Sequence, residues 1–224
     1  TFAAMIPMQV YNTLQVPKEQ SILMEIKHLI IGGGAIDDAL ANELKDFPNQ
    51  VWSTYGMTET LSHIALRKLN GTDTSDWYTP FDNVRIRLSE EETLIIHAPN
   101  VCAEELITND IAEINEEGKF RILGRKDNTI NSGGVKIQIE QVESRLRKHL
   151  DTPFLISARQ DAKFGEIVVL IYNKVGNEDN IRRVCESELP TYWVPKAYIA
   201  VDELPMTGTG KPDRASARRI ANGK

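Results

Sequence analysis

A short apolar run that ends in three glycines constrains the fold of this 224-residue chain more than any other feature. His28–Ile31 has the composition of a buried strand, and Gly32–Gly34 form a tight turn directly after it. Residues 36–47 then place apolar side chains at helical spacing, and Val51–Tyr55 predicts the next strand. Strand, helix and strand with short connections form the βαβ unit of a layered α/β domain.

The pattern changes to short strands between residues 84 and 123. Strands are predicted at Val84–Leu88, Thr93–His97 and Phe120–Leu123, and the turns at 89–92 and 116–119 are acidic, the second with a glycine. This arrangement indicates hairpins of a small β-rich subdomain. We expect a domain boundary near Arg125–Asn128.

Beyond that boundary the sequence predicts a smaller α+β domain over residues 127–224, after a larger domain over 1–126. The expected elements are helices at about 138–150, at 178–188 and from 213, and strands at 154–159, 166–172 and 197–201. The predicted fold class is therefore α/β (α+β): a layered α/β segment and a β-rich subdomain, followed by a small α+β domain.

The composition argues against several classes of partner. The net charge of −6 disfavours nucleic acid, because affinity for nucleic acid comes from clustered Lys and Arg. No apolar run approaches the roughly 20 residues that span a membrane. Cys102, Cys185 and four scattered histidines suit neither a disulfide scaffold nor a zinc site. We expect a cytoplasmic protein and leave open whether it forms a homo-oligomer.

Two loops of the first part could carry chemistry. Gly32–Gly34 would let a flat ligand or a phosphate lie against bare backbone, and the alternative is a plain strand-to-helix turn. Thr54–Thr60 places a carboxylate beside hydroxyls at the end of a strand, which suits Mg²⁺ and a phosphate oxygen. The alternative there is that Thr58 or Thr60 caps a helix.

A third loop, Pro205–Asp213, superficially resembles a phosphate-binding Walker loop. Pro205 stands where that motif needs its first glycine, and Pro212 stands where it needs Ser or Thr, so we reject that interpretation. The sequence predicts a flexible loop that ends in Lys211. An isolated lysine of this kind is usually a solvated surface residue.

Six segments occur together in one order along almost the whole chain. They are Gly32-Gly33-Gly34-Ala35, Tyr55-Gly56-Met57-Thr58-Glu59-Thr60, Thr108-Asn109-Asp110, Gly124-Arg125-Lys126-Asp127, Ser132-Gly133-Gly134-Val135-Lys136 and Gly208-Thr209-Gly210-Lys211. In this order they resemble the adenylate-forming superfamily of acyl- and aryl-CoA ligases, luciferases and peptide-synthetase adenylation domains. The resemblance implies an ATP-dependent acid–CoA ligase that forms an acyl-adenylate and then a CoA thioester. The implied ligands are a carboxylic acid, ATP, Mg²⁺ and CoA.

The resemblance also implies roles in nucleotide binding. Gly33 and Gly34 would pass along the adenine, on which Tyr55 would stack. Asp110 and Arg125 would bind the ribose.

Further roles concern catalysis and domain movement. Thr58 would contact the α-phosphate, Glu59 would ligate Mg²⁺, and Lys211 would approach the carboxylate and the α-phosphate during adenylation. The small domain would be mobile about a hinge at Asp127. Its loop with Gly133, Gly134 and Lys136 would face the active site during thioester formation.

Residues 55–66 and the opening Ile6–Val10 look most like the ligases that act on o-succinylbenzoate in menaquinone biosynthesis. Ser62 and His63 would then line the acyl pocket, although His63 could equally be a packed core or surface residue. The alternatives are a ligase for another aryl or short-chain acid, or a non-catalytic nucleotide-binding module. The family's Ser/Thr/Gly-rich phosphate loop does not occur in this chain and lies upstream in the family. We therefore expect a fragment, and the activity of the isolated segment is an open question.

Overall fold

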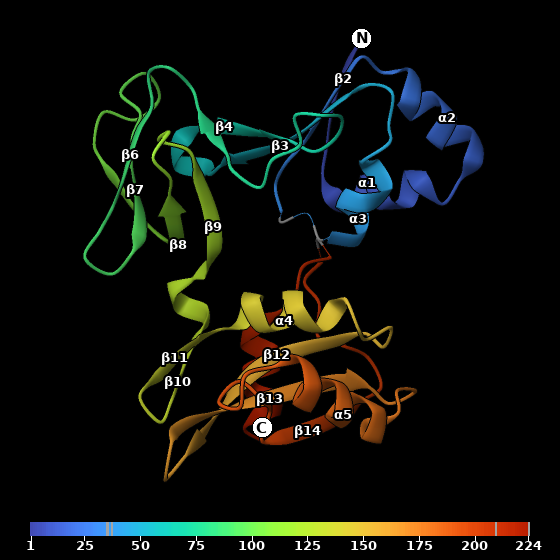
Figure 1. Ribbon diagram of the computed structural model, residues 1–224, viewed down its shortest axis with the longest axis vertical. Coiled ribbons are helices and arrows are strands. Elements are labelled where there is room, and N and C mark those ends of the chain that lie inside the picture. The colour runs from blue at the N-terminus through green and yellow to red at the C-terminus, as the bar shows by residue number, and fades with distance from the viewer. Residues whose placement is uncertain (35, 37, 209, 224) are drawn as a thin grey trace. The chain divides into compact units, whose positions relative to one another are not determined.

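The computed structural model describes residues 1–34, 36, 38–208 and 210–223. Ala35 and Thr209 of the six segments, and Asp37 of the predicted helix at 36–47, lie outside the described residues. The chain divides into two compact units, Thr1–Ile122 and Leu123–Lys224, and most of their helices and strands are labelled in Figure 1. Each unit is described by itself.

The first unit contains a five-stranded sheet with strands in sequence order. These strands are β1 (Phe2–Met5), β2 (His28–Ile31), β3 (Gln50–Gly56), β4 (His63–Lys68) and β5 (Thr79–Pro80). The β1–β2 and β2–β3 pairs are parallel, and the pairs that follow are antiparallel. Helix α3 (Asp38–Leu44) connects β2 to β3, which confirms the predicted βαβ unit. The glycine turn and Tyr55 therefore come at the same edge of the sheet, where parallel strands end.

Two helices that the sequence analysis did not predict, α1 (Pro7–Leu14) and α2 (Pro17–Glu25), precede β2. Each begins with proline, whose fixed φ suits the first helical position and whose missing N–H is not needed there. They are short, so their stability depends on packing. The buried side chains of α1 and α2 share one core with side chains of the sheet and of α3. This core contains Val10, Leu14 and Leu23 from the two helices, Leu29, Ile31 and Val51 from the sheet, and Leu40 and Leu44 from α3.

The predicted β-rich subdomain is a four-stranded sheet. Its strands are β6 (Arg85–Leu88), β7 (Thr93–His97), β8 (Leu106–Ile114) and β9 (Phe120–Arg125), in that order. Leu94, Ile96 and Phe120 are buried in one core with Ile64 and Ala65 from β4. The two sheets of this unit are thus joined by apolar packing as well as by the chain.

The second unit is built around a mixed sheet with helices on both faces. The strands are β10 (Thr129–Ser132), β11 (Val135–Gln138), β12 (Phe154–Asp161), β13 (Gly165–Asn173) and β14 (Ala197–Val201). The helices are α4 (Ile139–Arg147), α5 (Glu178–Glu188) and α6 (Arg214–Ala221), in agreement with the three predicted helices. No helix in the described parts of either unit is long and apolar enough to cross a membrane.

Alternation along the central strands explains this layering. Ile156 and Leu170 belong to the core that includes side chains of α4 and α5, whereas Leu155 and Ile171 belong to the core that includes α6. A strand buried on both faces needs a nearly continuous apolar run rather than alternating polarity, and β13 has such a run.

Candidate functional site

Two of the predicted nucleotide-binding residues meet in the first unit. Tyr55 lies near the end of β3 and Asp110 lies in β8, and both are partly exposed. The Tyr55 hydroxyl donates a hydrogen bond of 2.6 Å to Asp110 Oδ2. Hydrogen bonds to a carboxylate are stronger than those between neutral groups, so each side chain restrains the other.

An aromatic cluster fixes the Tyr55 ring. Its centroid is 5.0 Å from that of Phe120 in an edge-to-face arrangement and 5.9 Å from that of Tyr78. Tyr78 in turn stacks on Phe120, and its hydroxyl lies 2.8 Å from Ser53 Oγ. The sequence analysis missed Tyr78 and Phe120, because a lone aromatic residue outside a motif carries no local signal that it packs against a site.

In the segment Thr108-Asn109-Asp110, the threonine supports the backbone and the aspartate belongs to the candidate site. Thr108 is buried, and its hydroxyl donates to Leu94 O at 2.8 Å while accepting from the Asp110 N–H at 3.1 Å. Asn109 is exposed. Thr108 therefore holds the backbone that presents Asp110.

The loop after β3 is fixed by Thr60, the last residue of the 3₁₀ helix η1 (Thr58–Thr60). Thr60 is 1% exposed, and its hydroxyl accepts from the Met57 N–H at 3.0 Å and contacts Ser62 O at 2.7 Å. Thr60 therefore fixes the backbone at the start of η1, and the chemical roles of Thr58 and Glu59 stay predictions. Gly56 is required for the same turn, because a Cβ there would lie 2.6 Å from His63 Cα.

Thr58 and Glu59 remain on the exposed side of this pinned loop. The described residues contain no group of three or more His, Cys, Asp or Glu that could hold a metal by themselves. A single exposed carboxylate nevertheless suits Mg²⁺, which proteins commonly bind through one or two carboxylates together with substrate phosphates. Glu59 fits that donor set.

The glycine turn at Gly32–Gly34 allows another group to come close to its backbone. Gly33 has a φ of +75°, a conformation that favours glycine. Gly32 has no room for a side chain, because Thr54 Oγ1 of β3 would collide with a Cβ there. Gly34, which is partly exposed, continues the turn.

Ser62 and His63 are neighbours at the start of β4. Ser62 Oγ and His63 Nδ1 are 3.1 Å apart, and the His63 ring lies edge-to-face with Phe81 at 5.6 Å. Ser62 is exposed and His63 is partly exposed. The contact with Phe81 gives His63 a packing role, and a part in an acyl pocket stays a prediction.

Arg125 and the predicted hinge residue Asp127 form an ion pair of 3.1 Å. Arg125 ends β9 and precedes the 3₁₀ helix η2 (Lys126–Asn128), which contains Asp127. Both side chains are about half exposed. The predicted roles of Arg125 in ribose binding and of Asp127 as the hinge stay predictions.

The predicted CoA-side loop is a tight hairpin turn. Gly133 and Gly134 connect β10 to β11, and both have positive φ, 59° and 87°. Two-residue hairpin turns that match strand twist need positive φ, which explains the pair of glycines. The Gly133 N–H donates to Phe164 O at 2.8 Å, and Lys136 on β11 is exposed.

Lys211 lies in a loop whose two ends are paired, and the expected flexibility of this loop stays a prediction. The Thr207 N–H donates to Lys211 O at 2.7 Å, and the Asp213 N–H donates to Pro205 O at 2.9 Å. Between these bonds Pro212 pairs with Met206 in an isolated bridge. Pro212 has no N–H, but the hydrogen bonds of this pairing are donated by Thr207 and Asp213, so proline does not interrupt it. The Lys211 side chain is exposed.

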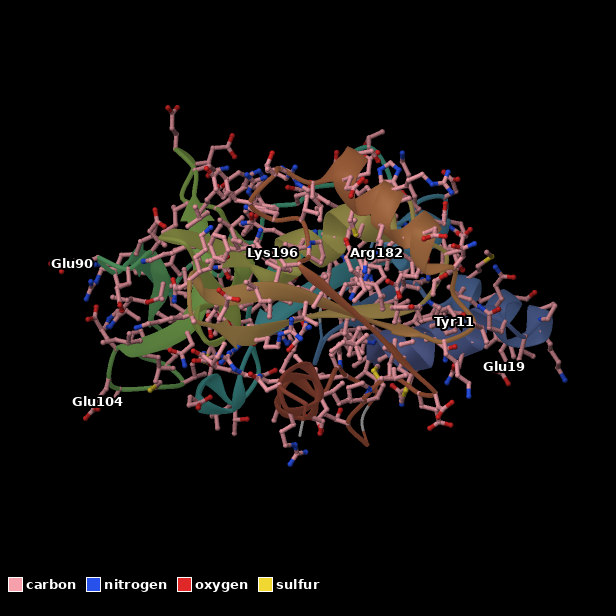
Figure 2. All side chains as sticks on the ribbon, turned by 90° about the horizontal axis from the view of Figure 1, so that it is seen from below. Tyr11, Glu19, Glu90, Glu104, Arg182 and Lys196 are labelled. Carbon is pink, nitrogen blue, oxygen red and sulfur yellow. The ribbon has the colours of Figure 1, made fainter. Side chains whose placement is uncertain are left out.

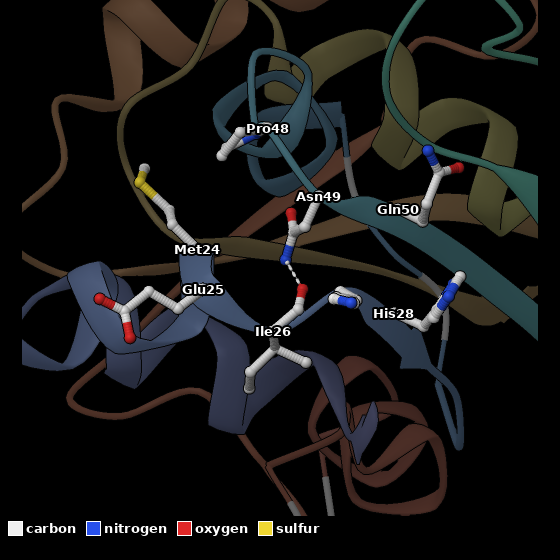
Figure 3. A pocket seen from close by; sticks show the side chains of 8 residues that line it. Met24, Glu25, Ile26, His28, Pro48, Asn49 and Gln50 are labelled. Atoms are coloured by element: carbon white, nitrogen blue, oxygen red, sulfur yellow. Dashed lines mark hydrogen bonds between the residues drawn. The ribbon is translucent and has the colours of Figure 1, made fainter. Parts of the chain in front are cut away.

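A separate hollow of about 370 Å³ lies at the amino ends of β2 and β3, lined by residues 24–28 and 48–50 (Figure 3). The Asn49 side chain there donates to Ile26 O at 2.7 Å. Because Tyr55 and the glycine turn follow the carboxyl ends of these strands, this hollow is at the opposite edge and contains none of the predicted site residues.

The comparisons with known proteins identify the class. Residues 155–211 match the family model for the AMP-binding enzyme C-terminal domain. Residues 155–211 thus match a domain of adenylate-forming enzymes, and most of the chain is similar to the carboxyl-terminal portion of AMP-forming acid–CoA ligases.

The sequence similarity to individual curated relatives is distant. The 2-succinylbenzoate–CoA ligase of Bacillus cereus is 28% identical over 227 residues, which covers 87% of this chain and 47% of the relative. The chain thus spans about half the length of the curated relatives it matches.

Solved structures agree on the fold. An acyl-CoA synthetase (AMP-forming)/AMP-acid ligase II-like protein from Dyadobacter fermentans is 31% identical, with a TM-score of 0.55 over 96% of this chain and 63% of its own. The o-succinylbenzoate CoA synthetase of Bacillus subtilis in complex with its acyl-adenylate intermediate is 22% identical, with a TM-score of 0.77 over 97% of this chain and 50% of its own. That enzyme has also been solved with ATP and a magnesium ion.

Proposed function

We propose that the protein carrying this chain is an ATP-dependent acid–CoA ligase whose acid is o-succinylbenzoate. The observation that carries the nucleotide part is the hydrogen bond between Tyr55 and Asp110, two motif residues from different sheets. A ring and a carboxylate held together suit a nucleoside, because the ring offers stacking and the carboxylate accepts from ribose hydroxyls.

Adenylation needs a carboxylate to attack an anionic phosphorus, so positioning and charge neutralisation are its main requirements. In the proposed site Thr58 and Glu59 come from the loop that Thr60 pins, which limits their movement. Glu59 would hold Mg²⁺, which neutralises phosphate charge when bound. Lys211 would supply a further positive charge beside the α-phosphate.

Thioester formation uses CoA in place of the departing AMP and needs a different wall around the same adenylate. In the proposal the second unit turns about Asp127 and presents the loop of Gly133, Gly134 and Lys136. Because Lys211 lies in a loop that is paired across its ends, movement of the whole unit, rather than of the loop alone, would bring it to the adenylate or withdraw it.

The choice of acid rests on the relatives named 2-succinylbenzoate–CoA ligase and on the sequence of residues 55–66. The test is a panel of aryl and short-chain acids given to the full-length protein with ATP, Mg²⁺ and CoA. We expect AMP and pyrophosphate release with o-succinylbenzoate above all others. Preference for another acid would overturn the substrate, and no turnover with any acid would favour a nucleotide-binding module.

A further inference from the structure

A buried carboxylate in the second unit receives four side-chain and backbone donors. Glu143 of α4 has a side chain that is 3% exposed. Its oxygens accept from Arg214 Nη1 at 2.6 Å and Nη2 at 2.8 Å, from the Ile156 N–H at 2.9 Å and from Arg147 Nη2 at 3.2 Å. One side chain thus ties together α4, β12 and α6.

Arg214 stands at the junction between α6 and the lysine loop. It is the first residue of α6 and comes three residues after Lys211. The preceding Asp213 caps the helix by accepting from the Ser216 N–H at 3.0 Å, and its own N–H closes the loop onto Pro205 O. Anything that fixes Arg214 therefore fixes the end of the loop that carries Lys211.

The chemistry of the Glu143–Arg214 pair favours a role in orienting two elements over a role in stabilising the fold. Burial opposes the charge on Arg214, but its hydrogen bonds with Glu143 raise the pKa of the guanidinium, so Arg214 remains charged. A buried ion pair is often no more stabilising than apolar side chains of similar volume. The two hydrogen bonds from the Arg214 guanidinium to the Glu143 carboxylate fix the orientation of α6 relative to α4.

We propose that Glu143 and Arg214 are positioning residues that hold the Lys211 loop in register with α4 and β12, so that the ammonium reaches the reacting carboxylate at one defined place. The inference rests on the proposed function for its catalytic consequence. Its structural part, the restraint on the loop, stands separately. Neither residue is proposed to touch the substrate.

The restraint can be measured without activity, by hydrogen exchange and mass spectrometry on the full-length protein. In Arg214→Met, the amides of residues 205–213 should exchange about tenfold faster, because local opening is easier, while those of α5 stay unchanged. The matched control is Arg182→Met on α5, which breaks an Arg–Glu pair of 2.7 Å with Glu178 (Arg182 is labelled in Figure 2). Unchanged exchange of the loop in Arg214→Met would overturn the proposal.

The catalytic consequence is tested by separating the half-reactions. Arg214→Met should lower adenylation by about tenfold to a hundredfold, as a misplacement of about 1 Å does, and leave thioester formation from supplied adenylate nearly unchanged. Arg182→Met should change both rates by no more than about twofold, as surface substitutions usually do. Equal losses in both half-reactions of a folded Arg214→Met would mean a purely structural role.

Arg214→Lys keeps the positive charge beside Glu143 but cannot make both hydrogen bonds of the guanidinium. It is the variant to test if Arg214→Met does not fold. We expect faster loop exchange and a smaller loss of adenylation than in Arg214→Met. Wild-type exchange and wild-type adenylation in Arg214→Lys would overturn the proposal. If the wild-type protein adenylates no acid, the proposed function fails, and the exchange experiment still decides the restraint.

Discussion

At the scale of single residues, the candidate site depends on side chains that are held by others. Asp110 is presented by Thr108 and receives the Tyr55 hydroxyl, while Tyr55 is held by Phe120 and Tyr78. A carboxylate has about four acceptor positions, so the tyrosine bond and a ribose diol can be accommodated together. Preorganisation of this kind lowers the cost of ordering the site when a nucleotide binds.

Removing the Tyr55 hydroxyl tests this arrangement. Tyr55→Phe should raise the KM for ATP about tenfold, since a hydrogen bond to a charged group contributes roughly 1.5–3 kcal/mol. Tyr78→Phe is the matched control, because it removes a hydroxyl in the same aromatic cluster that contacts Ser53 rather than Asp110. Steady-state kinetics at varied ATP measure both, and equal effects of the two variants would argue against a role of Asp110 in nucleotide binding.

The motifs predicted which residues would gather, but not what would support them. Tyr55 and Asp110 were expected at one nucleotide and are hydrogen-bonded in the structure. The support from Tyr78 and Phe120 joins chain segments that are far apart, which no spacing rule reveals.

At the scale of elements, a hydrogen bond joins α5 to β13 and is sensitive to pH at both extremes. The Tyr172 hydroxyl donates to Glu178 Oε2 at 2.7 Å. This bond, together with those from Arg182, lowers the pKa of Glu178. The same bond, with burial, raises the pKa of Tyr172 to about 12.

The signs of these shifts give two pH windows. The stabilisation from Glu178 is present above its unfolded pKa of 4.5 and is lost as pH falls through the lower folded value. The stabilisation from Tyr172 is present below its unfolded pKa of 10.0 and is lost as pH rises from there to about 12.

Tyr172→Phe should therefore lower the free energy of unfolding by about 1 kcal/mol near neutral pH, with a smaller difference from wild type in both windows. Urea unfolding followed by circular dichroism across pH measures this difference. Tyr192→Phe, at a side chain that is 67% exposed, is the control and should match wild type throughout. A constant difference between Tyr172→Phe and wild type at all pH values would contradict the assignment.

At the scale of the whole molecule, the proposed reaction assigns different parts of the second unit to different steps. In that proposal Lys211 would act in adenylation, and the Gly133–Gly134 turn would act in thioester formation. Both lie on paired backbone rather than on loose chain. The proposal thus requires the unit to move as a body.

A Lys211→Ala change in the full-length protein should lower the rate of adenylation by about 10²–10³, the usual loss when one transition-state charge contact is removed. Thioester formation from supplied acyl-adenylate should be nearly unaffected. Lys174→Ala, at a lysine that is 65% exposed in the same unit, controls for the loss of surface charge. Pyrophosphate exchange and single-turnover thioester assays separate the steps, and equal losses in both would refute the role of Lys211.

The sequence by itself determined the βαβ unit, the β-rich subdomain and the helices of the second unit. These follow from periodicity and from residues whose spacing is local, such as the glycines before α3 and between β10 and β11. Tertiary structure alone decided the direct hydrogen bond from Tyr55 to Asp110, the aromatic support from Tyr78 and Phe120, and the ion pair between Glu143 and Arg214. These contacts join residues from 23 to 71 positions apart, and only the packing of sheets and helices brings such residues together.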